Sequence, residues 1–150
     1  MMSSVRYRRL EVALVAVALS AAVVLELGDR AAAQAPAAAP LATQTSSQGA
    51  VTVAVKPIAL SASVPELRFE IVQDTHSVAL SQDMRAVAVL SGGPGGDVKP
   101  AAWEGDPPGG HHRKGVLVFA PISPMPESVT LTIRGLGGVP ERTFTWAVPK

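Results

Sequence analysis

The side chains best suited to chemistry are the three histidines, and they lie in two short stretches of the chain. His76 belongs to DTHSVALS, residues 74–81, and His111 and His112 belong to WEGDPPGGHHRKGVLVF, residues 103–119. Imidazole combined with carboxylate, and without thiolate, is a ligand set that suits Zn²⁺ and Cu²⁺. The sequence therefore singles out these two stretches as places where a Cu or Zn ion could bind.

Asp74 supplies the carboxylate of this candidate site. In an extended chain Asp74 and His76 project from one face, because they are two residues apart. His111 and His112 are adjacent, so only one of them could join that face. The candidate metal ligands are Asp74, His76, His111 and His112. The alternative is that His76 bonds within its own turn and the His pair is solvated, because this set matches no established ligand spacing.

Catalytic sites of other kinds are not indicated. A hydrolase would need Ser77, either His76 or His111, and Asp74 to converge. Adjacent residues of a strand point to opposite faces, so His76 is badly placed to serve Ser77. The chain also has no G-x-S-x-G motif. GGPGGDVK, residues 92–99, lacks the G-K-[ST] ending of a phosphate-binding loop and is typical of a turn between strands. We therefore expect a protein that is not an enzyme and whose cofactor, if it has one, is Cu or Zn.

The remaining conspicuous residues near the His pair favour structural roles. Trp103 is expected to pack over one end of the domain, because two tryptophans cannot form a multi-ring platform for sugars. Arg113 and Lys114 are expected to be solvated and paired locally with Glu104 and Asp106, and exposed pairs of this kind contribute little stability.

The elements that must position these residues are short β-strands. From Ala50 onwards apolar residues recur with period two, and Gly- and Pro-rich turns separate nearly all of the runs. This pattern predicts an all-β fold, an immunoglobulin-like antiparallel β-sandwich of about seven strands over residues 50–150. The expected strands are 50–56, 67–73, 84–91, 97–103, 113–119, 127–134 and 141–148. The expected core residues are Phe69, Ile71, Val87, Val89, Leu117, Phe119, Leu131, Ile133, Phe144 and Trp146.

The order of these strands predicts which loops meet. If successive strands run antiparallel, every second connection lies at the same end of the domain. The connections at 74–83, 104–112 and 135–140 would then share one end, and GGPGG would lie at the other. We therefore expect Asp74, His76 and one histidine of the pair to share a ligand, with Trp103 nearby.

Three segments together resemble a known group of sequences. They are DTHS, the WEG–GGHHR–GVL stretch and the closing GVPERTF strand, and the resemblance that they carry covers residues 50–148. In these segments the chain resembles a group of small exported bacterial and archaeal proteins of uncharacterised function. The resemblance implies a β-sandwich and brings no activity or functional residue with it.

Residues 1–33 have the organisation of a secretion signal. Three arginines precede the uncharged apolar run VALVAVALSAAVVL, residues 12–25, and AAAQA follows at 31–35. As a helix the run would span roughly 21 Å, which is short of the ~30 Å hydrocarbon core. The alternative is an uncleaved N-terminal helix that anchors the protein in the membrane. Residues 34–49 are rich in Ala and Pro, show no apolar period and are expected to be a linker.

Composition limits the location and the partners. The chain has no cysteine, and from Gln34 onwards nine basic residues balance nine acidic ones, so nucleic acid is not an expected partner. We expect an exported module, periplasmic or secreted, whose His-containing loops bind an envelope protein or a small ligand. The alternative is a dedicated periplasmic Cu- or Zn-binding protein. A membrane is expected as a partner only through an uncleaved signal segment.

Signal cleavage should leave Gln34 as the first residue. Ala31 and Ala33 provide small side chains at the −3 and −1 positions, whereas a cut after Ala35 would place Pro36 beside the scissile bond. Intact-mass analysis of the protein from the exported fraction checks this, and a mass that includes residues 1–33 would favour the anchor instead.

Overall fold

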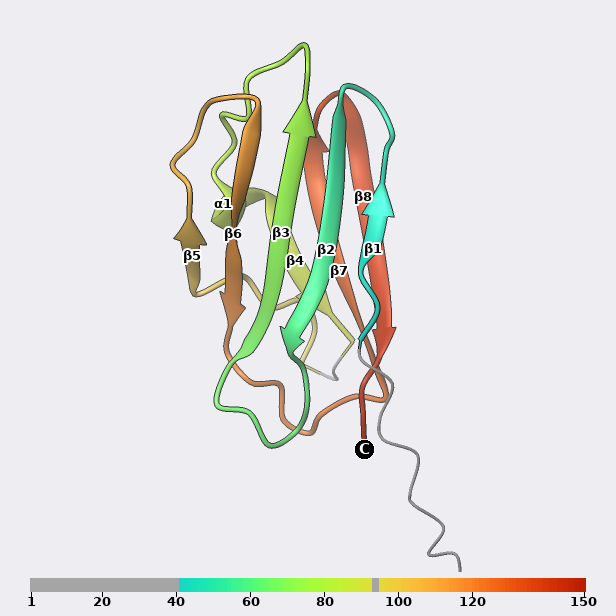
Figure 1. Cartoon of the computed structure of the whole chain (residues 1–150). Coiled ribbons are helices and arrows are strands. Elements are labelled where there is room, and N and C mark those ends of the chain that lie inside the picture. The colour runs from blue at the N-terminus through green and yellow to red at the C-terminus, as the bar shows by residue number, and fades with distance from the viewer. Residues whose placement is uncertain (1–40, 93–94) are drawn as a thin grey trace, which may run out of the picture. The chain divides into compact units, whose positions relative to one another are not determined.

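The computed structural model describes residues 41–92 and 95–150, which form two antiparallel sheets (Figure 1). In chain order the elements are β1 (Gln44–Ser46), β2 (Val51–Ala59), β3 (Leu67–Thr75), α1 (Met84–Val87), β4 (Ala88–Ser91), β5 (Ala102–Gly105), β6 (His112–Phe119), β7 (Ser128–Leu136) and β8 (Val139–Ala147). One sheet has the order β1-β2-β3-β6-β5, and the other has the order β4-β7-β8. The predicted all-β class is confirmed.

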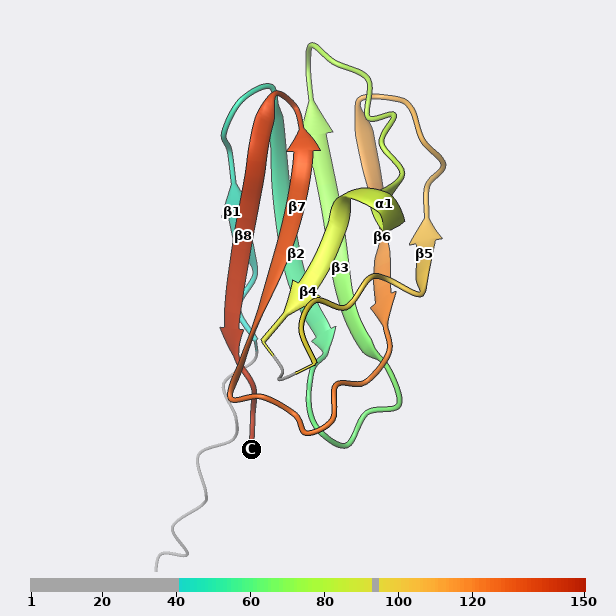
Figure 2. The same cartoon turned by 180° about the vertical axis from the view of Figure 1, so that it is seen from behind.

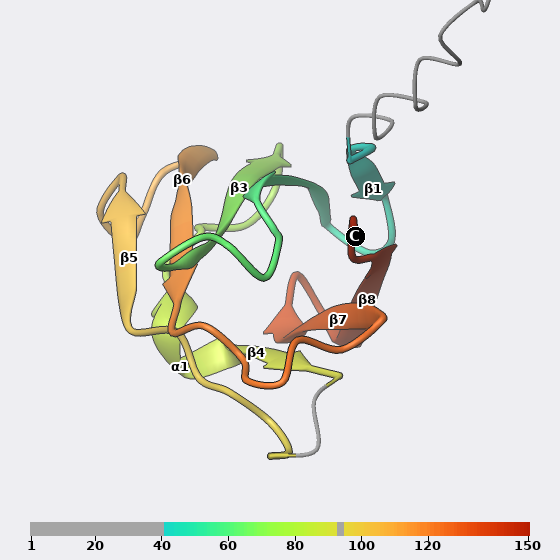
Figure 3. The same ribbon diagram turned by 90° about the horizontal axis from the view of Figure 1, so that it is seen from below.

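The two sheets enclose one apolar core, and Figure 3 shows them as separate layers on either side of it. Period-two alternation places every second side chain of the long strands inside, as in β3, whose burial alternates along its length. Aromatic rings fill this core: the Phe69 ring meets the Trp146 ring of the other sheet at 5.6 Å and the Phe119 ring of its own sheet at 5.8 Å between centroids. Such pairs add about 0.5–1.5 kcal/mol each to the stabilisation from buried area.

The predicted burial of the core residues is confirmed at nine of ten positions, and the exception is Val87. Val87 is only partly buried, and Val89 is buried but lies outside the main core cluster. Ala88 and Leu90 occupy the core instead. The side chains of this segment that enter the main core are therefore one residue away from the expected Val87 and Val89, and such a step exchanges the two faces of a strand.

A helical turn in the same segment explains the error. Residues 84–91 were expected to form a central strand, but Met84–Val87 form α1 and only Ala88–Ser91 form β4, an edge strand (Figure 2). Asp83 starts the turn, because its side chain accepts a hydrogen bond of 2.9 Å from the Arg85 amide. Met84 then lies fully buried against Gln73, whose amide nitrogen is 2.8 Å from the Met84 sulfur.

Two other boundaries differ from the expectation. The strand expected at 97–103 begins only at Ala102, after Pro100, and Val98 instead forms an isolated bridge with Leu90 of β4. Residues 44–46, expected to lie in a linker, form β1 and pair with β2. Residues 1–40, which include the predicted signal and the first part of the linker, lie outside the described residues.

The predicted grouping of the loops is confirmed. Leu80 and Gly110 are joined by a backbone hydrogen bond of 3.1 Å, and so are Ala50 and Gly137, so the β3–α1, β5–β6 and β7–β8 connections lie at one end. We call this the loop end. Gly92 lies at the other end, against the start of β7. The turn at Gly137 requires glycine, because its φ is 63° and a Cβ would lie 2.5 Å from a Val51 methyl group.

Both ends of the described chain lie away from the loop end. Figure 1 shows the start of β1 and the C-terminus together at the opposite end of the two sheets. The Trp146 indole donates a 2.8 Å hydrogen bond to the Ala42 carbonyl there. Within residues 41–92 and 95–150, no helix has the length and apolar character needed to cross a bilayer.

Truncation of Phe144 should test the core assignment. Phe144 is 2% exposed and stacks on Trp146 with ring centroids 6.3 Å apart. We expect Phe144→Ala to lower the free energy of unfolding by about 3–5 kcal/mol, measured by urea denaturation. Thr143→Ala, at an exposed position of the same strand, should change it by less than about 0.5 kcal/mol. Equal effects of the two variants would contradict the assignment.

Candidate functional site

Backbone hydrogen bonds join the two stretches that contain the histidines. The Thr75 amide donates to the His111 carbonyl at 2.9 Å, and the Gly109 amide donates to the Leu80 carbonyl at 2.9 Å. Leu80 in turn donates to Gly110. The β3–α1 and β5–β6 connections therefore form one bonded unit, although about thirty residues separate them in the sequence.

Asp74 and His112 form the one side-chain pair among the four candidate ligands. They are register partners on β3 and β6, and the Nδ1 atom of His112 lies 2.5 Å from the Oδ1 atom of Asp74. Both side chains are more than half exposed. The pair therefore lies on the solvent face of the five-stranded sheet, where a ligand can approach the Nε2 atom of His112.

His76 and His111 do not continue this arrangement. After Thr75 the chain turns, because the Thr75 hydroxyl donates to the Ala50 carbonyl and accepts from the Ser77 and Val78 amides. The expectation from the two-residue spacing placed His76 on an extended strand with Asp74, but β3 ends at Thr75. Both His76 and His111 are exposed. In the part of the chain that the structure describes, no three His, Asp or Glu side chains lie close enough to hold an ion. The shared three-residue site is thus not formed, and metal binding stays a prediction.

Arg113 was expected to be solvated, and that expectation was wrong. Arg113 is 2% exposed, although it lies between the exposed His112 and Lys114. Its register partner on β3 is Gln73, which is also fully buried. The parity of β6 contained this signal, since residue 113 shares a face with the apolar core residues 117 and 119.

The guanidinium of Arg113 is satisfied by backbone carbonyls from both connections. Its Nε atom donates to the Asp106 carbonyl at 3.1 Å, and Nη1 donates to the Gln82 carbonyl at 2.6 Å and to the Leu80 carbonyl at 3.4 Å. Burial lowers the pKa of Arg113, and the negative charges of Asp83 and Asp106 oppose that shift. The group stays protonated near neutral pH, so the charge is held inside the loop end.

Trp103 packs beneath this guanidinium. The Arg113 guanidinium carbon lies 5.0 Å from the centre of the Trp103 ring, a cation–π distance, and the indole donates to the Asp106 carbonyl at 2.9 Å. Gly115 makes room for the ring, because a Cβ there would lie 2.5 Å from Trp103. Trp103 therefore packs against neighbouring residues, as expected from the sequence.

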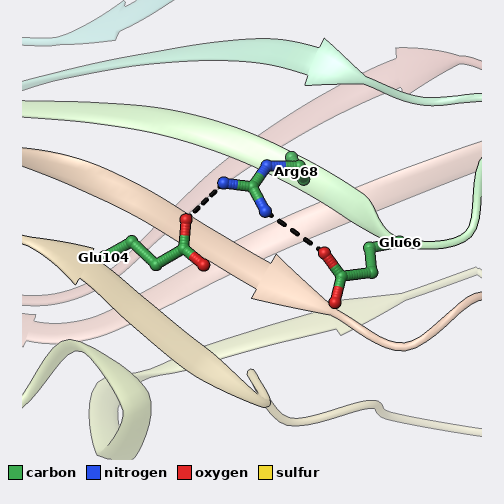
Figure 4. Close-up of polar contacts among 3 residues, drawn as sticks. All are labelled: Glu66, Arg68 and Glu104. Carbon is green, nitrogen blue, oxygen red and sulfur yellow. Dashed lines mark hydrogen bonds and ion pairs between the residues drawn. The ribbon is translucent and has the colours of Figure 1, made fainter.

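The other charges near the site pair along the outer face of the five-stranded sheet. Figure 4 shows Arg68 between Glu66 and Glu104, and its Nη1 atom lies 3.2 Å from Glu66. The hydrogen bond to Glu104 raises the pKa of Arg68. Lys114 pairs with Glu70 at 3.0 Å. Glu104 thus pairs with Arg68 and Lys114 pairs with Glu70, each on another strand. The partners expected from nearby positions in the sequence were wrong.

Comparisons with known proteins do not assign a family. The chain matches no family model, no curated protein and no solved structure. The resemblance to small exported proteins stays a prediction.

Replacement of Arg113 should loosen the loop end. Arg113→Met keeps an unbranched side chain and removes the donors for the three carbonyls. We expect the free energy of unfolding to fall by about 1–3 kcal/mol, and the Gly109 amide to exchange hydrogen faster. Arg134→Met is the matched control, because Arg134 is exposed and bonds only Glu141 among the described residues. Unchanged exchange at Gly109 in Arg113→Met would contradict the proposed role.

Proposed function

We propose that the protein is a non-enzymatic, exported module of the cell envelope that binds a partner or ligand through its loop end. The observation that carries the proposal is the bonded unit of two connections that exposes His76, His111 and His112 at the end farthest from both described termini. Loops held by a rigid scaffold are where such domains bind other molecules. Export is supported by the organisation of residues 1–33.

We further propose that the fold is an immunoglobulin-like sandwich. Without β1, the strand orders are β2-β3-β6-β5 and β4-β7-β8. Naming these seven strands A to G in chain order gives the sheets ABED and CFG, which is the order of constant-type immunoglobulin domains. In that architecture the loops gather at the two ends of the sandwich, as the loop end does here.

The geometry around His112 favours binding over catalysis. A hydrolytic triad needs a nucleophile that is hydrogen-bonded to the base, while a third group orients the base. Asp74 could orient His112, but no hydroxyl of residues 41–92 or 95–150 is hydrogen-bonded to the imidazole. The pair is also open to solvent, which screens the charges that a reaction would use.

Crosslinking at the loop end tests partner binding. Val78 lies there and is 36% exposed, whereas Ile58 lies near the opposite end of β2 and is 49% exposed, so the two positions are matched large apolar residues. With a photoreactive phenylalanine at position 78 in the producing cells, we expect a discrete adduct with an envelope protein. The same group at position 58 should give none. Adducts of equal yield at both positions would contradict the proposal.

The second candidate is a dedicated Cu- or Zn-binding protein, and the Asp74–His112 pair is the observation that favours it. One carboxylate and one imidazole are two of the ligands that such an ion needs. Rotation of the exposed side chains of His76 or His111 would have to supply the others.

Calorimetric titration of the metal-free protein with Cu²⁺ and with Zn²⁺ tests this second candidate. If the pair holds the ion, His112→Ala and Asp74→Asn should weaken binding at least about tenfold, the range seen when groups that hold a metal site are removed. His111→Ala, which changes an equally accessible imidazole, should weaken it less. Absence of binding heat, together with no metal in the purified protein, would exclude this function.

A further inference from the structure

A polar slot lies between β1 and β8, where an edge of one sheet faces an edge of the other. It has a volume of about 330 Å³ and is lined by Gln44–Gln48 and by Glu141–Phe144. Figures 1 and 2 show the two strands side by side from opposite directions. The slot is on the flank of the molecule and is separate from the Asp74–His112 pair, which lies on the outer face of the five-stranded sheet.

The backbone of β8 presents free hydrogen-bonding groups to this slot. The Val148 amide bonds the Glu127 carbonyl, so the even-numbered residues of this strand direct their backbone groups to β7. The backbone groups of Thr145 and Thr143 therefore point the other way, into the gap. No backbone bond between β1 and β8 is found in the described residues.

Gln44 already fills one position along this edge. Its side-chain amide donates to the Thr145 carbonyl at 2.5 Å and accepts from the Thr145 amide at 3.2 Å. A carboxamide has the same donor and acceptor as a peptide group, so Gln44 occupies the place of one residue of an added strand. Thr143 lies two residues before Thr145 on β8, and its backbone amide and carbonyl bond no such side chain among the described residues.

The opposite wall of the slot has the same character. The Thr75 amide bonds the His111 carbonyl, so the even-numbered residues of β3 bond the even-numbered residues of β2. Val53 and Val55 of β2 therefore direct their backbone groups to Ser46 and Gln44 of β1. The backbone amide and carbonyl of Thr45 therefore point away from β2 and face the slot. Each wall thus offers one peptide group to a molecule lying between them.

Arg142 closes the end of the slot nearest the loop end and has one bond unmade. The side chain is 3% exposed, and its Nη atoms donate to Ser46, Gln48 and Leu136. Its buried Nε atom has no hydrogen-bond partner among the described residues. A buried donor left unpaired costs about 1–3 kcal/mol.

We propose that this slot binds a short extended peptide segment of another protein, whose backbone pairs with Thr143 and Thr45. The reciprocal amide pairing at Thr145 is the pattern that such a peptide would continue. The ends closed by Gln44 and Arg142 limit the pairing to two or three residues. Recognition through main-chain bonds depends little on the peptide sequence.

The test follows backbone amides by NMR in the ¹⁵N-labelled protein. The probe is the blocked tripeptide acetyl-Ser-Val-Ser-amide, and the comparison ligand is a disaccharide of N-acetylglucosamine. We expect the peptide to shift the Thr143 and Thr45 amide resonances saturably, while the disaccharide leaves them unchanged. Shifts caused by the disaccharide alone, or no saturable shift with the peptide, would overturn the proposal.

Three variants make the test specific. Thr143→Pro removes the backbone amide of residue 143, which faces the slot and makes no bond to β7. This variant should abolish the resonance shifts caused by the peptide. Ala147→Pro is the matched control, because it has the same strand parity but lies outside the slot, and it should leave binding unchanged. Ser47→Trp should also abolish binding by filling the slot, and it replaces Thr143→Pro if that variant does not fold.

Removal of Gln44's side chain should have the opposite effect. Gln44→Ala frees the Thr145 amide and carbonyl for the peptide, so its affinity should rise about three- to tenfold, the range of one or two hydrogen bonds. A polar groove that does not recognise peptide backbone would show no rise. Weaker binding in Gln44→Ala, with an unchanged melting temperature, would overturn the proposed pairing.

Discussion

Two buried guanidinium groups hold the loop end together. Arg113 and Arg142 are the buried cations of the described chain, and both direct their donors at backbone carbonyls in connections rather than at carboxylates. A buried charge is costly unless its hydrogen bonds are made. The carbonyls of separate loops must therefore converge on each group, so the conformations of these loops depend on one another.

The apolar core is what allows these charges to be placed. The chain has no cysteine, so packing alone must hold the two sheets together. Phe69 and Trp146 pack against each other across the two layers, and the two arginines lie toward the loop end of the same interior. Because the strands are fixed by the core, the register that faces Asp74 with His112 and Gln73 with Arg113 is fixed as well.

The two candidate binding surfaces differ in what they offer a partner. The loop end presents exposed imidazoles on loops whose backbone is internally bonded, which suits recognition by side chains. The slot between β1 and β8 presents peptide groups of strand edges, which suits recognition of a backbone. Edges of this kind are usually covered or interrupted, and here Gln44 and Arg142 cover both ends of the gap.

Local alternation in the sequence determined much of this protein. Period two predicted most strands and the core positions, and strand parity predicted that the histidine-containing loops share an end, because both depend only on neighbouring residues. Tertiary structure alone decided that Asp83 starts a helical turn, that residues 44–46 pair with β2, and that His112 rather than His76 meets Asp74. The physical reason is that register and desolvation involve partners far apart in the chain. The Asp83 cap itself is local, but the turn that it starts is packed through Met84, which is buried against Gln73 of β3. Arg113 illustrates this: its parity was visible, but the carbonyls that make its burial tolerable come from residues 80, 82 and 106.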